Sequence, residues 1–293
     1  MSQITLLDGG MGQELIHRAG DRPTPLWSTQ VMIDRPGLVG QVHADFTAAG
    51  ATVATLNTYA SHVDRLADTE MAGQQMQLLK TAVAEAEGVR GKARIAGSIG
   101  PLIASYRPDI HPAGDVAIPL YRDVAQALAP HVDLIICETV ASVDHARSVL
   151  TAAKETGLPV WLAVTVQDDD GIKLRSGEPV ADVLPVLDGA AAVLVNCSVP
   201  EAIAPALAVL AQAGLPFGAY ANAFTKISDG FLKTKPTVDA LSVRHDITPA
   251  VYADHAMAWV DQGATIVGGC CEVSPAHISA IAERLRAAGH TIV

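Results

Sequence analysis

Short apolar segments alternate with longer helical segments along almost the whole chain. The apolar segments carry few polar side chains, so neither of their faces is suited to contact with water. Such segments, separated by helices, are typical of a parallel sheet that is buried on both faces. We expect strands at 4–7, 52–56, 94–97, 133–137, 160–164, 192–195, 217–220 and 265–267. We expect helices at 36–49, 67–87, 115–131, 142–156, 181–188, 200–213, 248–262 and 275–288.

About eight strand–helix pairs in 293 residues fit a closed (β/α)8 barrel better than an open doubly wound sheet. Hydrophobic residues make up 49% of the chain, which is enough for one large core. No G-x-G-x-x-G motif opens a helix, and no Pro/Gly-rich linker divides the chain. The sequence therefore predicts an α/β fold, a single (β/α)8 TIM barrel domain over residues 1–293.

The charge balance limits the partners that this chain can have. The formal net charge is −11, and no block of Lys and Arg occurs, which argues against nucleic acid and anionic membranes as partners. We find neither a signal-peptide pattern at the N-terminus nor an apolar run of about 18 residues. Four cysteines in a chain of this length are not a disulfide framework. We expect a cytoplasmic protein.

Polar residues follow the carboxyl ends of most predicted strands. In a barrel these ends meet on one face, which is the face where active sites are built. Asn, Thr and Asp also cap the helices that follow strands, so each residue alone is weak evidence. The set comprises Asp8, Asn57, Thr58, Tyr59, Ser98, Glu138, Thr139, Cys197, Asn222, Cys270 and Cys271.

The cysteines are the most specific members of this set. Cys270 and Cys271 follow two glycines at the end of an apolar run, and Cys197 follows the apolar run 192–195 in the same way. Three thiolates on neighbouring strand ends would form an open zinc site with three protein ligands and one free position. The alternatives are buried apolar filler, a strained vicinal disulfide, or a redox switch. Cys137 precedes Glu138, so strand alternation predicts that it lies in the core.

Two other features need an interpretation. The glycine-rich loop Asp8–Gly12 follows the first strand, and its exposed backbone N–H groups could bind a carboxylate, although a plain tight turn explains the sequence equally well. Ten histidines are scattered along the chain, and we expect His17, His43 and His62 to be surface or capping residues.

The motifs together resemble those of the homocysteine S-methyltransferase family, which comprises betaine- and S-methylmethionine-dependent enzymes and the homocysteine-binding barrel of methionine synthase. The resemblance extends over nearly the whole chain, and its most specific motifs are the two that contain the cysteines. The matching segments are 7–12, 57–59, 96–101, 137–139, 195–197 and 268–271.

The resemblance implies a role for each matching residue. Cys197, Cys270 and Cys271 correspond to three zinc ligands, and Asp8 and Glu138 to acids that bind the amino group of L-homocysteine. The loop of Gly9, Gly10, Met11 and Gly12 is similar to the one whose backbone amides bind its carboxylate. Asn222 resembles an asparagine that can occupy the free zinc position, and Tyr59 an aromatic residue on the methyl-donor side. Ser98 and Thr139 belong to the same substrate-binding motifs.

The implied reaction is transfer of a methyl group from a small donor to the zinc-bound thiolate of homocysteine, which gives methionine. A cationic sulfonium or ammonium donor would favour aromatic neighbours, and Trp27, Tyr59, Tyr106 and Tyr220 are available. A separate corrinoid protein remains an alternative donor. A zinc hydrolase is disfavoured because no H-x-H follows a strand. A non-catalytic zinc or thiol sensor would not require Asp8, Glu138 and the glycine loop. The oligomeric state cannot be predicted from the sequence.

Overall fold

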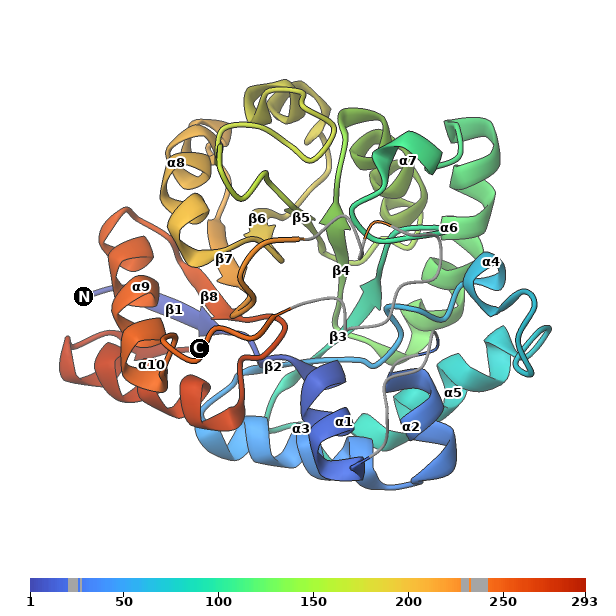
Figure 1. Cartoon of the computed structure of the whole chain (residues 1–293), viewed down its shortest axis with the longest axis horizontal. Coiled ribbons are helices and arrows are strands. Elements are labelled where there is room, and N and C mark those ends of the chain that lie inside the picture. The colour runs from blue at the N-terminus through green and yellow to red at the C-terminus, as the bar shows by residue number, and fades with distance from the viewer. Residues whose placement is uncertain (21–25, 27, 228–231, 233–241) are drawn as a thin grey trace.

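Eight parallel strands form a closed barrel in the computed structural model, which describes residues 1–293 except 21–25, 27, 228–231 and 233–241. The sheet order is β2-β3-β4-β5-β6-β7-β8-β1-β9, and helices surround it (Figure 1). Closure between β1 and β2 rests on a parallel bridge between Leu7 and Val53 and on a 2.7 Å hydrogen bond from the Thr52 N–H to the Leu6 carbonyl. The predicted (β/α)8 barrel is confirmed.

All eight predicted strands are present. Their bounds are β1 (Gln3–Leu6), β2 (Val53–Thr55), β3 (Arg94–Ile99), β4 (Leu134–Val140), β5 (Val160–Val164), β6 (Ala192–Asn196), β7 (Phe217–Ala221) and β8 (Ile266–Gly269). A short additional strand, β9 (Thr291–Ile292), pairs in parallel with the outer part of β1. This pairing brings the two ends of the chain together.

The helices agree less closely with the predictions. Their bounds are α1 (Met11–Ala19), α2 (Ser28–Asp34), α3 (Leu38–Ala49), α4 (Val63–Leu66), α5 (Gln75–Ala86), α6 (Gly114–Leu128), α7 (Val143–Lys154), α8 (Pro200–Leu210), α9 (Pro249–Asp261) and α10 (Pro275–Ala287). Helices α1, α2 and α4 lie outside all of the predicted helices. The helix predicted at 67–87 begins only at Gln75, and the one predicted at 181–188 is the 3-10 helix Val180–Val186, which contains Pro185.

Alternate residues of each strand pack into two separate layers. On β6, Ala192 and Leu194 pack inside the barrel, whereas Val193 and Val195 pack outward against the helices. This explains why the strands are apolar throughout, because both of their faces are buried. No helix within the described parts of the chain has the length and apolarity that a membrane span requires.

Two of the three predictions for histidine were wrong. His17 is exposed as expected, but His43 and His62 are completely or almost completely buried. His62 precedes α4, yet its side chain makes no capping hydrogen bond. Burial lowers the pKa of each of these two imidazoles to about 4, so both are neutral at physiological pH.

Candidate functional site

One pocket opens at the carboxyl ends of the barrel strands and contains most of the residues predicted for the site. It is lined by residues in the carboxyl-terminal parts of β2, β3, β4, β7 and β8 and by residues that follow β1, β2, β3, β6 and β8. The predicted residues among them are Asp8, Gly9, Gly10, Met11, Gly12, Tyr59, Ser98, Glu138, Cys197, Cys270 and Cys271.

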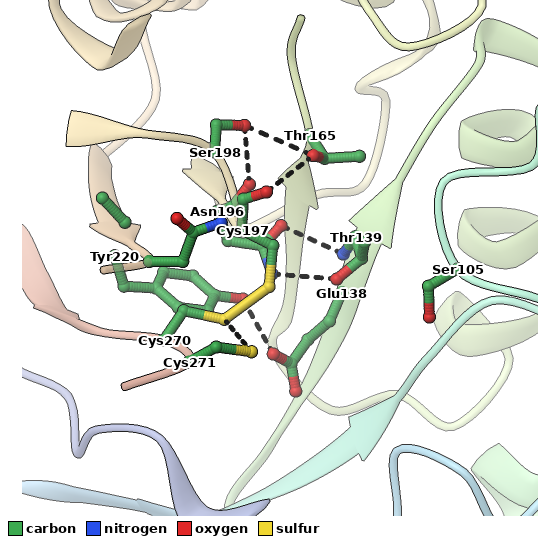
Figure 2. Close-up of a disulfide and its surroundings, with 12 residues drawn as sticks. Ser105, Glu138, Thr139, Thr165, Asn196, Cys197, Ser198, Tyr220, Cys270 and Cys271 are labelled. Atoms are coloured by element: carbon green, nitrogen blue, oxygen red, sulfur yellow. Dashed lines mark hydrogen bonds between the residues drawn. A yellow bond between two sulfur atoms is a disulfide. The ribbon is translucent and has the colours of Figure 1, made fainter. Parts of the chain in front are cut away.

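The three predicted cysteines meet at one side of this pocket. Their sulfur atoms all lie within 4.8 Å of one another. Cys197 and Cys270 are joined as a disulfide with a Cα–Cα distance of 5.9 Å, and the Cys270 and Cys271 sulfurs are 3.9 Å apart (Figure 2). The bond therefore links two strand ends and not the adjacent pair of cysteines. Cys137 is free, fully buried and part of the main core, as predicted.

Local backbone geometry turns Cys197 toward the other two cysteines. Cys197 has a φ of 47°, a left-handed conformation that is uncommon for a residue with a side chain. Asp168 connects the segments around it, because its carboxylate accepts hydrogen bonds from the N–H groups of Val199 and Ile227. Arg175 forms two parallel hydrogen bonds of 2.8 and 2.9 Å to the same carboxylate. This partly buried Asp168–Arg175 pair holds the loops after β5, β6 and β7 around Cys197.

The glycine loop after β1 is interlocked with the cysteine loop after β8. The Gly10 N–H donates a 2.8 Å hydrogen bond to the Val273 carbonyl. A Cβ atom on Gly10 would lie 2.6 Å from the Cys270 carbonyl oxygen, which is closer than atoms in non-bonded contact can approach. Only glycine therefore allows the two loops to approach this closely.

Two buried acids face the same pocket. The Asp8 carboxylate accepts hydrogen bonds from the Thr55 N–H (2.7 Å) and hydroxyl (2.8 Å). The Glu138 carboxylate accepts from the Ser98 hydroxyl (2.5 Å) and from the Tyr220 hydroxyl (3.2 Å; Figure 2). Burial raises the pKa of Asp8 to about 7, and the charge of Glu138 adds to this effect. Burial also raises the pKa of Glu138. Two acids in this state favour a bound cation, because a positive charge stabilises their ionised forms.

The cysteine cluster has the donor atoms and arrangement of a site for a thiophilic metal. Burial raises the pKa of the Cys271 thiol to about 12, and the charges of Glu272 and Glu138 raise it further. Without a compensating positive charge, the Cys271 thiol would therefore remain protonated. A divalent metal supplies that charge, and three sulfur ligands leave one coordination position free.

Three aromatic side chains line the remainder of the pocket: Tyr59, Tyr106 and Tyr220. The Tyr59 hydroxyl is 2.7 Å from the Ser105 hydroxyl, which joins the loop after β2 to the loop after β3. Tyr106 packs against the cysteines, and the Arg175 guanidinium lies 5.2 Å from its ring centre. Trp27, the fourth aromatic residue considered, lies outside the described residues.

Two predicted residues do not line the pocket. The side-chain oxygen of Asn222 accepts a hydrogen bond from the Phe224 N–H at 3.1 Å. Thr139 has a φ of 57°, and both its N–H and its hydroxyl bond to the side chain of Asn196. The roles in substrate binding that the resemblance implies for these two residues stay predictions.

Several residues at the site were not predicted from the sequence. Gln13 and Ser28 line the pocket but belong to α1 and α2, neither of which was predicted. Ser105 lines it from the loop after β3. Asp168 and Arg175 lie seven positions apart in an irregular loop, a spacing that carries no recognisable signal.

Comparison with known proteins identifies the family of this chain. The family model for homocysteine S-methyltransferase matches residues 5–285. Homocysteine S-methyltransferase of Escherichia coli (strain K12) is 30% identical, over 96% of this chain and 95% of that protein. The homocysteine methyltransferase MmuM from Escherichia coli has been solved in a metallated form (TM-score 0.79, 26% identity) and in an oxidized form (0.78, 27%). These alignments cover 97% and 96% of this chain, and 96% of MmuM in each case. The chain belongs to the homocysteine S-methyltransferase family.

Proposed function

We propose that the protein is a zinc-dependent homocysteine S-methyltransferase that produces methionine. The observation that carries the proposal is the presence of three cysteine sulfurs and two buried acids in one pocket. Homocysteine carries a thiol and an ammonium group on one short chain, so it matches both features. A thiol or metal sensor would require the cysteines but has no use for the acids.

Each half of homocysteine has a binding partner in this pocket. Asp8 and Glu138 bind the ammonium group, and the N-terminal end of α1 binds the carboxylate. Cys197, Cys270 and Cys271 hold the metal, which we assign as zinc because three thiolates with one open position are typical of catalytic zinc. Zinc bound there would lower the pKa of the substrate thiol, whose ordinary value is about 8.5.

The side chains of the pocket orient the substrate. With the ammonium held by two acids, the substrate sulfur is directed toward the cysteines, and Tyr59 and Tyr106 cover the approach of the donor. A bond forms between this sulfur and the donor methyl carbon, and the bond from that carbon to the donor heteroatom breaks. The leaving group keeps the electron pair, so a sulfonium donor departs as a neutral thioether. No protein base is required, because the thiol has already lost its proton.

The donor is a small cation in this proposal, and the aromatic lining by Tyr59 and Tyr106 supports it. The reduced, zinc-loaded protein should be supplied with homocysteine and, in parallel, S-methylmethionine, S-adenosylmethionine, betaine or dimethylsulfoniopropionate. Methionine formed with one of them identifies the donor class. A zinc-loaded protein that binds homocysteine but reacts with none of the four would contradict a free small donor and would indicate a methyl-corrinoid protein.

We expect metal binding to require a reductant. In the disulfide between Cys197 and Cys270, the two sulfurs are bonded to each other and cannot act as thiolate ligands. Treatment with a dithiol should raise the free thiols per chain by two and the bound zinc from near zero to about one. Atomic emission together with thiol titration measures both quantities. Full zinc binding by the oxidised protein would contradict the ligand assignment.

We expect acidification to weaken the use of homocysteine through Asp8. Asp8 has a pKa of about 7 and can pair with an ammonium group only when it is ionised. Since Asp8 must lose its proton before it can bind the ammonium group, kcat/KM for homocysteine should fall as the pH drops below about 7. The decrease should approach tenfold per pH unit. The Asp8→Asn variant should have a lower kcat/KM and lose this acidic limb. An unchanged limb in the variant would assign the titration to another group.

A further inference from the structure

Gln13 is a buried polar residue that lines the pocket. Its side chain is 4% exposed, and it lines the pocket as the third residue of α1. Within the described parts of the chain, nothing accepts a hydrogen bond from its Nε2 atom. A buried amide without a hydrogen-bond partner lowers the stability of the fold. Its presence in a binding pocket therefore points to a ligand that forms the missing hydrogen bond.

The backbone around Gln13 also offers unused hydrogen-bond donors. The N–H groups of Gly10 and Met11 are bonded to the Val273 and Gly9 carbonyls. For the N–H groups of Gly12 and Gln13, no acceptor is found among the described residues. The residue before α1 is Gly10, which has no side chain to cap them. The helix end therefore presents two backbone donors and one amide side chain to the same part of the pocket.

The charges in the pocket indicate which group binds there. Of the described residues that line it, none is Lys, Arg or His, whereas Asp8 and Glu138 are acids. An anionic group on the substrate must therefore be held by neutral donors at a helix N-terminus. The terminal amide of Gln13 can present its NH2 group to the pocket by a half-turn about its last bond.

We propose that Gln13 is a specificity-determining residue whose NH2 group binds the α-carboxylate of homocysteine, together with the N–H groups of Gly12 and Gln13. This inference rests on the proposed function, since it assumes that homocysteine occupies the pocket. It explains how a site that contains two acids accepts an α-amino acid and not only an aminothiol.

Two variants of nearly equal size test the assignment. Gln13→Met removes the donor, and Gln13→Glu keeps the shape but places a negative charge beside the carboxylate. The Kd for homocysteine, measured by calorimetry on the reduced, zinc-loaded protein, should rise about tenfold in Gln13→Met and at least about 100-fold in Gln13→Glu. The kcat should stay within about twofold, because the carboxylate is bound equally in the ground and transition states.

A substrate without a carboxylate provides the control. With 3-aminopropane-1-thiol, the wild type and Gln13→Met should have the same Kd within about twofold. Equal or tighter binding of homocysteine by Gln13→Glu would overturn the proposal, because the amide oxygen would then be accepting from the ammonium group. An increased KM for the donor alone would also overturn it. If the wild type binds homocysteine but forms no methionine, the proposed function fails, while the Kd comparison still tests Gln13.

Discussion

Replacing Cys270 with alanine is expected to abolish zinc binding and methionine formation while the barrel remains folded. Cys270 lies at the end of β8, with its sulfur within 4.8 Å of those of Cys197 and Cys271. Two remaining sulfurs do not make a closed three-ligand site. A free homocysteine thiol with a pKa of about 8.5 is only about 3% ionised at pH 7, and its orientation is also lost. We expect kcat/KM to fall at least about 100-fold and bound zinc to fall well below one per chain.

The matched control is Cys137→Ala. Cys137 is free, buried in the main core and separated from the pocket, so this variant loses some packing but no metal ligand. It should bind zinc like the wild type. Circular dichroism should show the same helix content in both variants. A Cys270→Ala protein that keeps both zinc and turnover would refute the ligand assignment.

Replacing Glu138 with glutamine is expected to weaken homocysteine binding strongly and at the same time to stabilise the substrate-free protein. The substrate ammonium loses one of two charged partners, so KM for homocysteine should rise about 10- to 150-fold. Burial raises the pKa of Glu138, which means that the fold disfavours its ionised form relative to the unfolded chain. This penalty is absent at low pH and grows as the pH rises above the ordinary value of 4.5. At pH 8 the variant should therefore melt at or above the temperature of the wild type.

Glu178→Gln is the control for this change. Glu178 also accepts a hydrogen bond from a serine hydroxyl, that of Ser176 at 2.6 Å, but it does not line the pocket. Its KM for homocysteine should stay within about twofold of the wild type. If Glu138→Gln leaves KM unchanged, Glu138 does not bind the ammonium group, and its contacts with Ser98 and Tyr220 would be structural.

The strands could be predicted from the sequence because each is apolar on both faces. In a chain of this length, few structures other than a buried parallel sheet accommodate such segments. Helix α1 could not, because three glycines at 9, 10 and 12 predict a loop and have low helix propensity. The residue before its first turn, Gly10, is instead held against the loop after β8 by a hydrogen bond from its N–H to the Val273 carbonyl. The segment predicted as an α-helix at 181–188 is instead the 3-10 helix Val180–Val186, which contains Pro185, a residue without an N–H to donate.

The sequence was sufficient to predict that the cysteines and acids of the candidate site lie together. It was less informative about the direction in which each side chain points. The three cysteines and two acids meet as expected, since all lie in or just after the carboxyl-terminal parts of strands on one face. Strand ends do not determine where a side chain points, however. Left-handed residues such as Cys197 and Thr139 break the alternation, which turns Cys197 toward the pocket, while Thr139 bonds to Asn196. Gln13 was missed because its helix was missed.

The close approach of Gly10 to Cys270 suggests how such a barrel can diversify. Around Gly10 and Cys270 the pocket is built from backbone in direct contact with backbone, so a substitution at Gly10 would disturb both the glycine loop and the proposed metal site. The opposite side is joined by side chains, such as the contact between Tyr59 and Ser105, which can be exchanged without moving the barrel. In evolution or in engineering, new methyl donors would therefore be acquired through the loops after β2 and β3, while the machinery that activates the thiol is inherited unchanged.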